Sequence, residues 1–426
     1  MKKRIIALAA VMMLASSVLI GCGTTPATDA PTTDTPATET PVETPADTSE
    51  VSQITIFQSK VEITDQLQAA AAAYEAKTGI HVEVWGTTGD DFFNQLRMRL
   101  ASEQGPTIFN VSPGAEVEAV SAYMADLSSL TFLDQVIDGI LEEVDGKVVG
   151  IPYTLEGFGL VYNKDLYEAG DFADLDSIIA KMQRLNDAGT PALGLSSESF
   201  FLIGHILNWP FAMQADMEGF MADVIAGNVN LVDVPEFVEW AKLYAAIRDY
   251  SYNPMTMNYD RQTGGLATGD IASIHQGNWS VGMFADYDIP FEIGMGPVPI
   301  CGNQKISVGV PSVWAVNADA PAAEIQAGID FLEWLYNTPE GQSFLFDEFQ
   351  FLPIIAGLDS PNVDFLSKDM LRVAGEAGTI GWATNLYPAG IVDVHLVPIA
   401  EEFFTTNMTP EALLEAIQAA FQTAGN

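Results

Sequence analysis

Two tryptophans of the sequence could either bind a ligand or pack in the core. Trp382 is in the glycine-rich segment GTIGWATNLYP, which has no helical periodicity, and Trp279 follows a strand of small residues at the turn into a helix. An indole ring can stack on the C–H face of a sugar while neighbouring polar groups bind its hydroxyls. Both residues are therefore candidates for a sugar site, with burial in the core as the alternative.

Polar side chains follow three predicted strands near the N-terminus. Ser59 and Lys60 end the first strand, Asp90 comes after the second, and Asn110 and Ser112 follow the third. Ligands of open α/β sheets gather at the carboxyl ends of strands, so these side chains are further candidates. Turn formation explains Asn110 and Ser112 equally well, and capping of a helix is the commoner role for an aspartate in the position of Asp90.

The chain lacks the motifs of a cofactor or metal site. No Walker-type GK[ST] occurs, and the glycine pairs do not form a dinucleotide fingerprint. The four histidines have no spacing typical of metal ligands, so we expect structural roles for His81, His205, His275 and His395. The formal net charge of −40 makes nucleic-acid binding improbable. We expect no cofactor, no metal and no nucleic-acid partner.

The order of predicted elements indicates an α/β fold. The segment 52–112 contains apolar strands at ITIFQ, HVEVWG and TIFNVSP, separated by two helices, which is typical of a parallel sheet wound with helices. The segment 166–261 has mostly helical spacing. Trp240, Phe331 and Trp334 fall on amphipathic helices and are expected in the core.

The N-terminus has the composition of an export signal followed by a tether. Basic residues precede an apolar run that is too short to span a membrane. The run ends in LIGC, which resembles the lipobox of bacterial lipoproteins, in which the cysteine, here Cys22, carries a lipid. An ordinary secretory signal is the alternative. The Thr/Pro-rich acidic segment that follows has no aromatic residue and cannot bury enough surface to fold. We expect a signal peptide at 1–21 and a disordered stalk at 22–51.

Three internal segments, in the expected order, resemble the extracellular solute-binding proteins of bacterial ABC importers, within the sugar-binding family that includes the maltose-binding protein. They are GKVVGIPYTLEGFGLVYNKDLYEAG, LATGDIASIHQGNWSVGMF, and GVPSVWAVN followed by IDFLEWLYNTPEGQSFL. The first is similar to the family's first crossing between lobes, the second to its Gly-x-Trp turn, and the third to its return crossing. The lipobox with a stalk is similar to the Gram-positive, cell-surface form of such proteins.

This resemblance implies a two-lobed fold like that of periplasmic binding proteins, with discontinuous lobes and a hinged ligand cleft. The N-terminal lobe would contain residues 52–155 plus 310–349, and the C-terminal lobe residues 156–309 plus 350–426. The implied function is capture of a carbohydrate, here expected to be an oligosaccharide, and its delivery to a membrane-embedded ABC permease. We expect a lipid-anchored, extracellular, non-enzymatic monomer.

The resemblance also adds residues to the candidate site. Trp279 matches the Gly-x-Trp turn. Glu156 is at the position where the maltose binder's crossing carries a ligand-contacting acid, and Tyr153 lies beside it. A structural role, such as a hydrogen bond within the hinge, remains equally open for both crossing residues.

Two other functions remain open. A cell-surface glycoside hydrolase would need two carboxyl groups facing each other across a glycosidic bond, and no local motif proposes such a pair among the 57 Asp and Glu residues. The same fold could instead bind a polyamine, a peptide or a phosphate ester, although a phosphate ester would need clustered arginines and the six that follow Arg4 are spread from Arg97 to Arg372. An acidic cleft with aromatic rings would suit a polyamine.

Overall fold

The strands of the protein form two sheets. The structure, a computed structural model, describes residues 51–86, 92–102, 105–358 and 362–425. Within these ranges, the first sheet has the order β2-β1-β3-β11-β5-β4, and the second has the order β12-β10-β6-β8-β7, with β9 paired to β6. The mixed α/β class predicted from the sequence is confirmed.

The first sheet is built on three parallel strands. β1 (Gln53–Gln58) lies between β2 (His81–Gly86) and β3 (Ile108–Val111). The remaining strands are antiparallel to their neighbours: β11 (Val313–Val316), β5 (Lys147–Pro152) and β4 (Glu142–Val144). A strand from the second half of the sequence thus completes the N-terminal sheet, as the resemblance implied.

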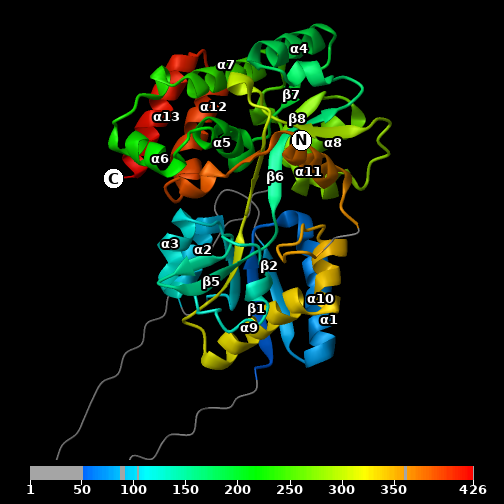
Figure 1. Cartoon of the computed structure of the whole chain (residues 1–426), viewed down its shortest axis with the longest axis vertical. Coiled ribbons are helices and arrows are strands. Elements are labelled where there is room, and N and C mark those ends of the chain that lie inside the picture. Colours follow the sequence, from blue (N-terminus) through cyan, green and yellow to red (C-terminus); the bar gives the residue numbers. More distant parts are fainter. Residues whose placement is uncertain (1–50, 87–91, 103–104, 359–361, 426) are drawn as a thin grey trace, which may run out of the picture. The chain divides into compact units, whose positions relative to one another are not determined.

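Helices cover both faces of the first sheet, as parallel sheets require. One core contains apolar residues of α1 (Thr64–Thr78) and α9 (Ala322–Asn337), and α10 (Pro339–Ser343) follows α9. A separate core on the same strands contains residues of α2 (Phe92–Leu100) and α3 (Ala115–Val120). Figure 1 shows α1, α9 and α10 beside the strands of this sheet.

The second sheet is centred on β6 (Glu156–Asn163). Its neighbours are β8 (Ser273–Gly277), β9 (Ile293–Gly296) and β10 (Ile306–Gly309), all antiparallel to it. The short strands β7 (Leu193–Gly194) and β12 (Thr379–Ile380) complete the edges. Every side chain of β6 except one is buried, which fits a strand covered on both faces.

Helices make up most of the rest of the chain. They are α4 (Leu175–Asp187), α5 (His205–Ala212), α6 (Met217–Ala226), α7 (Pro235–Tyr250), α8 (Tyr259–Thr268), α11 (Phe365–Ala377), α12 (Val397–Thr405) and α13 (Pro410–Ala424). Trp240, Phe331 and Trp334 are buried, as predicted. Among the described residues, none of the helices combines the length and the apolar character of a membrane span.

Three chain segments connect the two sheets and bond to one another. The first is the passage from β5 to β6, which Figure 1 shows as a direct continuation, and the second is the passage from β10 to β11. Tyr153 of the first donates its N–H to the carbonyl of Ser312 in the second at 2.9 Å. The third follows α10, and its Leu352 forms a β-bridge with Leu155 of the first segment. Connecting segments of this kind between two sheets are the places where a hinge motion can occur.

Candidate functional site

One cavity contains every candidate residue that the structure describes. Its volume is about 540 Å³, and its wall includes residues from both sheets and their helices. The candidates in the wall are Ser59, Lys60, Asn110, Ser112, Tyr153, Glu156, Trp279 and Trp382. Asp90 and Cys22 lie outside the described residues. Residues that are as much as 323 positions apart in the sequence, Ser59 and Trp382, therefore share one cavity.

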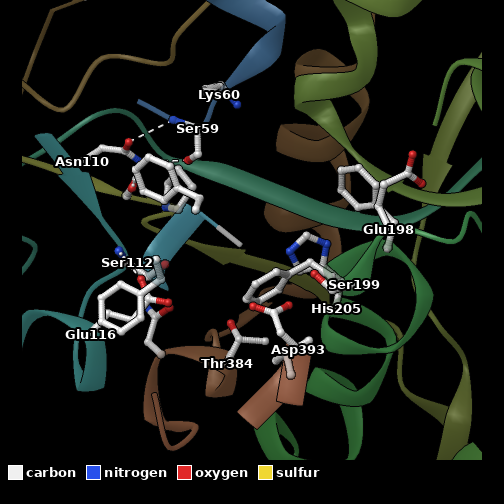
Figure 2. Close-up of a pocket in the computed structure, with 18 of the residues that line it drawn as sticks. Ser59, Lys60, Asn110, Ser112, Glu116, Glu198, Ser199, His205, Thr384 and Asp393 are labelled. Atoms are coloured by element: carbon white, nitrogen blue, oxygen red, sulfur yellow. Dashed lines mark hydrogen bonds between the residues drawn. The ribbon is translucent and has the colours of Figure 1, made fainter. Parts of the chain in front are cut away.

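Asn110 organises the strand ends of the first sheet. Its Oδ1 accepts the N–H of Ser59 at 3.0 Å, and its Nδ2 donates to the hydroxyls of Ser59 at 3.0 Å and Ser312 at 2.8 Å. Figure 2 shows this bonded pair at the cavity wall. Asn110 is buried and its amide is used within the protein, so it shapes the wall by fixing neighbouring hydroxyls.

An ion pair joins the two sheets inside the cavity. Lys60 Nζ lies 2.6 Å from Glu156 Oε1, and both side chains are largely buried. Burial opposes the charge of Lys60, but Glu156 and Glu62 favour it, and its pKa is raised above the usual value. Burial also raises the pKa of Glu156, with Lys60 acting in the opposite direction. The Lys60–Glu156 ion pair therefore lies at the start of β6.

The two tryptophans form part of one aromatic wall. The centroids of Trp279 and Trp382 are 6.3 Å apart with an interplanar angle of 79°, and each residue is only 8% exposed. Phe201 lies nearly parallel to Trp279, with an interplanar angle of 16°. Trp279 Nε1 donates to Gln276 Oε1 at 2.8 Å, which fixes the orientation of that ring. Flat rings at right angles offer two stacking surfaces to a ligand.

Tyr153 lies deeper in the wall. Its ring packs on Trp314 with centroids 4.0 Å apart, and the residue is 1% exposed. Burial raises the pKa of its hydroxyl well above the usual value, so the hydroxyl stays protonated.

Several cavity residues were missed by sequence reasoning. Figure 2 shows Glu116 on the side of the first sheet, and Glu198, His205, Thr384 and Asp393 on the side of the second. His205 was expected to have a structural role, but it lines the cavity. These residues lie on or beside helical segments, where sequence pattern does not distinguish a cavity-facing side chain from a solvent-facing one. The adjacent aromatic residues Phe200 and Phe201, both half-buried in the cavity wall, were a signal that sequence reasoning did not use.

Buried polar atoms without a hydrogen-bond partner concentrate in this wall. Among the described residues they include Tyr153 Oη, Glu198 Oε2, His205 Nδ1, Trp382 Nε1 and Tyr387 Oη. A buried polar group without a partner costs roughly 1 to 3 kcal/mol. Such donors and acceptors without partners are of the kind that pair with the hydroxyl groups of a polyhydroxylated ligand.

The cavity wall is strongly acidic. Lys60 is the only lysine or arginine among its described residues, and its carboxylates are Glu62, Glu116, Glu156, Glu198, Asp260 and Asp393. The described part of the chain holds no group of three or more His, Cys, Asp or Glu side chains arranged for a metal ion. The aromatic rings and buried polar atoms of the wall are suited to binding through ring stacking and hydrogen bonds.

Comparison with known proteins gives consistent results. A family model described as "Bacterial extracellular solute-binding protein" matches residues 69–369. A maltooligosaccharide ABC transporter solute-binding lipoprotein of Streptococcus pneumoniae serotype 4 is 24% identical over 361 residues, covering 80% of this chain and 78% of the relative. The melibiose/raffinose/stachyose-binding protein MelE of Bacillus subtilis is 30% identical over 108 residues, covering 24% of this chain and 25% of that protein.

Solved structures share the fold. The solute-binding protein RafE in complex with raffinose superposes with a TM-score of 0.74 at 18% identity, covering 88% of this chain and all of that one. A sugar transporter of Bacillus licheniformis in complex with stachyose gives a TM-score of 0.72 at 16% identity, covering 87% of this chain and all of that one. The matched family model spans well over half of this chain. This protein therefore belongs to the family of bacterial extracellular solute-binding proteins.

Proposed function

We propose that this protein is the substrate-binding component of an ABC sugar importer and that it captures an oligosaccharide in the cavity between its two sheets. The observation that carries the proposal is the wall in which Trp279 and Trp382 lie among buried polar atoms without partners. Such a wall offers ring faces to C–H groups and donors and acceptors to hydroxyls. The names of the relatives, which include a maltooligosaccharide lipoprotein and MelE, support a saccharide of more than one ring.

Binding would be coupled to movement of the two lobes. We propose lobes at 52–155 plus 310–349 and at 156–309 plus 350–426, because the sheets draw their strands from these ranges. The segment after 349 contributes to both sides of this division, since Phe351 packs in the core of the first sheet and Leu352 in a core of the second. Closure around the ligand would produce the form that a permease recognises, without any chemical step.

The N-terminal sequence supports a location at the outer face of a Gram-positive cell membrane. A signal peptide at 1–21 would be removed, Cys22 would carry the lipid, and the stalk at 22–51 would hold the domain away from the membrane. The protein would act as a monomer without a cofactor.

The proposal is tested by thermal unfolding and isothermal titration with maltotriose, raffinose, stachyose and chitotriose. A ligand at 100 times its Kd raises the free energy of unfolding by about 2.7 kcal/mol. We expect at least one saccharide to bind, and Trp279→Ala to lose that binding. Trp85→Ala removes an indole from β2 outside the cavity wall and is the matched control. Equal binding by both variants would contradict the proposed site.

The acidic wall also favours a second candidate ligand, a polyamine. The described residues of the wall include six carboxylates and one lysine, which is already paired with Glu156. A polyamine would bind through charge, and its affinity would fall steeply between 0.05 and 0.5 M NaCl, whereas that of a neutral sugar would change little. Titration of spermidine beside the saccharides therefore separates the two classes. Release of shorter sugars during incubation would identify a hydrolase instead.

A further inference from the structure

His205 occupies the middle of the aromatic wall. It begins α5 directly after a π-helical turn (Phe200–Gly204), in which its N–H donates to the carbonyl of Phe200. Its ring centroid lies 5.2 Å from that of Trp279 and 6.1 Å from that of Trp382. Single π-helical turns are frequent at functional sites because they shift the register of the side chains that follow. Here the turn precedes the imidazole that lies beside both indoles.

The ring is held by packing. It stacks on Phe158 with centroids 4.9 Å apart and an interplanar angle of 23°, and Phe200 and Phe201 flank it at 5.3 and 5.7 Å. The residue is 9% exposed, and its Nδ1 has no hydrogen-bond partner among the described residues. His275 also has a buried Nδ1 without a partner among the described residues, but its Nε2 accepts a hydrogen bond from Trp209 at 3.2 Å and it does not line the cavity. His205 thus presents a fixed polar ring on an otherwise aromatic surface.

The imidazole is neutral. Burial, assisted by the charge of Lys60, lowers the pKa of His205 to about 3. A neutral imidazole has one donor and one acceptor nitrogen, which matches a hydroxyl group that can also do both. An ammonium group could use only the acceptor nitrogen.

We propose that His205 is a specificity-determining residue of the ligand site, whose imidazole hydrogen-bonds to one hydroxyl of a saccharide stacked on Trp279 or Trp382. This inference rests on the proposed function. It adds the residue that distinguishes a saccharide with a given hydroxyl from the analogue that lacks this hydroxyl. A site built to bind a hydroxyl rejects the analogue that lacks it, because its own buried polar group is then left unpaired.

The test uses the full-length protein and its best ligand among maltotriose, raffinose, stachyose and chitotriose, together with singly deoxygenated forms of that ligand. His205→Phe keeps a flat ring in the aromatic cluster and removes both nitrogens. His205→Gln keeps polarity and serves if the phenylalanine variant does not fold. His81→Gln is the matched control, because His81 is exposed on β2 and lies outside the cavity wall.

We expect the variants at 205 to bind roughly 10- to 100-fold more weakly than wild type, as one buried hydrogen bond implies. One deoxygenated ligand should bind wild type more weakly than the parent sugar does. The His205→Phe variant should bind this analogue no more weakly than it binds the parent sugar. A structural role would instead weaken binding of all analogues alike. Binding within twofold of wild type, or a uniform loss, would overturn the inference alone. Absence of saccharide binding by wild type would overturn it together with the proposed function.

Discussion

Two glycines determine where the indole rings of the cavity can lie. Gly277 ends β8 beneath the ring of Trp279, and Gly309 ends β10 beneath the ring of Trp382. A Cβ atom at Gly309 would lie 2.5 Å from Trp382 Cγ. Since real Cβ contacts are not this short, any side chain at this strand end displaces the indole.

We predict that Gly309→Ala weakens saccharide binding by tenfold or more, because Trp382 has to leave its position in the wall. Isothermal titration measures the effect. Gly375→Ala is the control, since Gly375 is on the exposed face of α11 with no atom near the added methyl. That variant should be more stable than wild type by about 0.5 to 1 kcal/mol and bind normally. Equal affinities of the two variants would refute a role for the Trp382 ring.

Glu116 faces Asp393 across the cavity and is the clearest source of pH-dependent stability. Burial raises its pKa above the ordinary value of 4.5, the hydrogen bonds from Ser112 oppose this shift, and the charge of Asp393 increases it. The stabilising contribution of a carboxyl group whose pKa is raised by folding is fully present below the ordinary value and is lost as the pH rises through the folded value.

Glu116→Gln should therefore match wild type in melting temperature near pH 4 and exceed it by a few degrees at pH 8. The glutamine oxygen can still accept the N–H of Ser112, which Glu116 Oε2 accepts at 3.0 Å. Glu118→Gln, on the exposed face of the same helix, should show no such divergence. A constant difference between Glu116→Gln and wild type at all pH values would show that Glu116 is not the titrating group.

Sequence motifs located some site residues and missed others. Trp279 and Glu156 stand in segments with recognisable local patterns, so their position relative to strand ends could be predicted. Glu116 and His205 stand in helical segments. The register of His205 follows a π-helical turn, and Glu116 lines a cavity whose opposite wall comes from distant parts of the chain. No local periodicity encodes either feature, because periodicity reports only which residues of one regular element share a face.

A buried hydroxyl holds together two of the chain segments that connect the sheets. Thr154 Oγ1 accepts the N–H of Leu352 at 2.8 Å and lies 3.1 Å from the carbonyl oxygen of the same residue, to which it donates. Thr154 is 1% exposed. It therefore ties the first connecting segment to the third where both backbones lack regular sheet pairing.

Thr154→Val keeps the shape of the side chain and removes both bonds, leaving the N–H of Leu352 buried without its partner. We expect the free energy of unfolding to fall by roughly 1 to 3 kcal/mol in urea denaturation. Thr154→Ser retains the hydroxyl and should lose less. Valine and wild-type proteins of equal stability would show that the tie does not contribute.

The regular elements of the fold could be predicted from the sequence more fully than the short ones. The β1-α1-β2-α2-β3 order followed from hydrophobic periodicity, and the helical segment 166–261 from its spacing. The two-residue strands β7 and β12 were not predicted, because they are defined only by pairing with β8 and β10. Long-range pairing of this kind leaves no local pattern.

At the scale of the whole molecule, the sequence predicts a domain attached to the membrane by one residue. Cys22→Ala should release the protein from the membrane fraction into the medium or soluble fraction when it is expressed in a Gram-positive host, because the lipid would no longer be attached. Immunoblotting of fractionated cells measures the distribution, and Cys301→Ala, which changes the other cysteine, is the control. Retention of the Cys22→Ala protein in the membrane would contradict lipid anchoring.

We propose that a saccharide binds between the two sheets, against the indole rings of Trp279 and Trp382. A crystal structure of the protein with its best-binding oligosaccharide tests this most directly. We predict an intact sugar in the cavity, with one ring stacked on Trp279 or Trp382 and a hydroxyl within hydrogen-bonding distance of the polar groups beside them. Density for the sugar outside this cavity, or for cleaved products within it, would contradict the account.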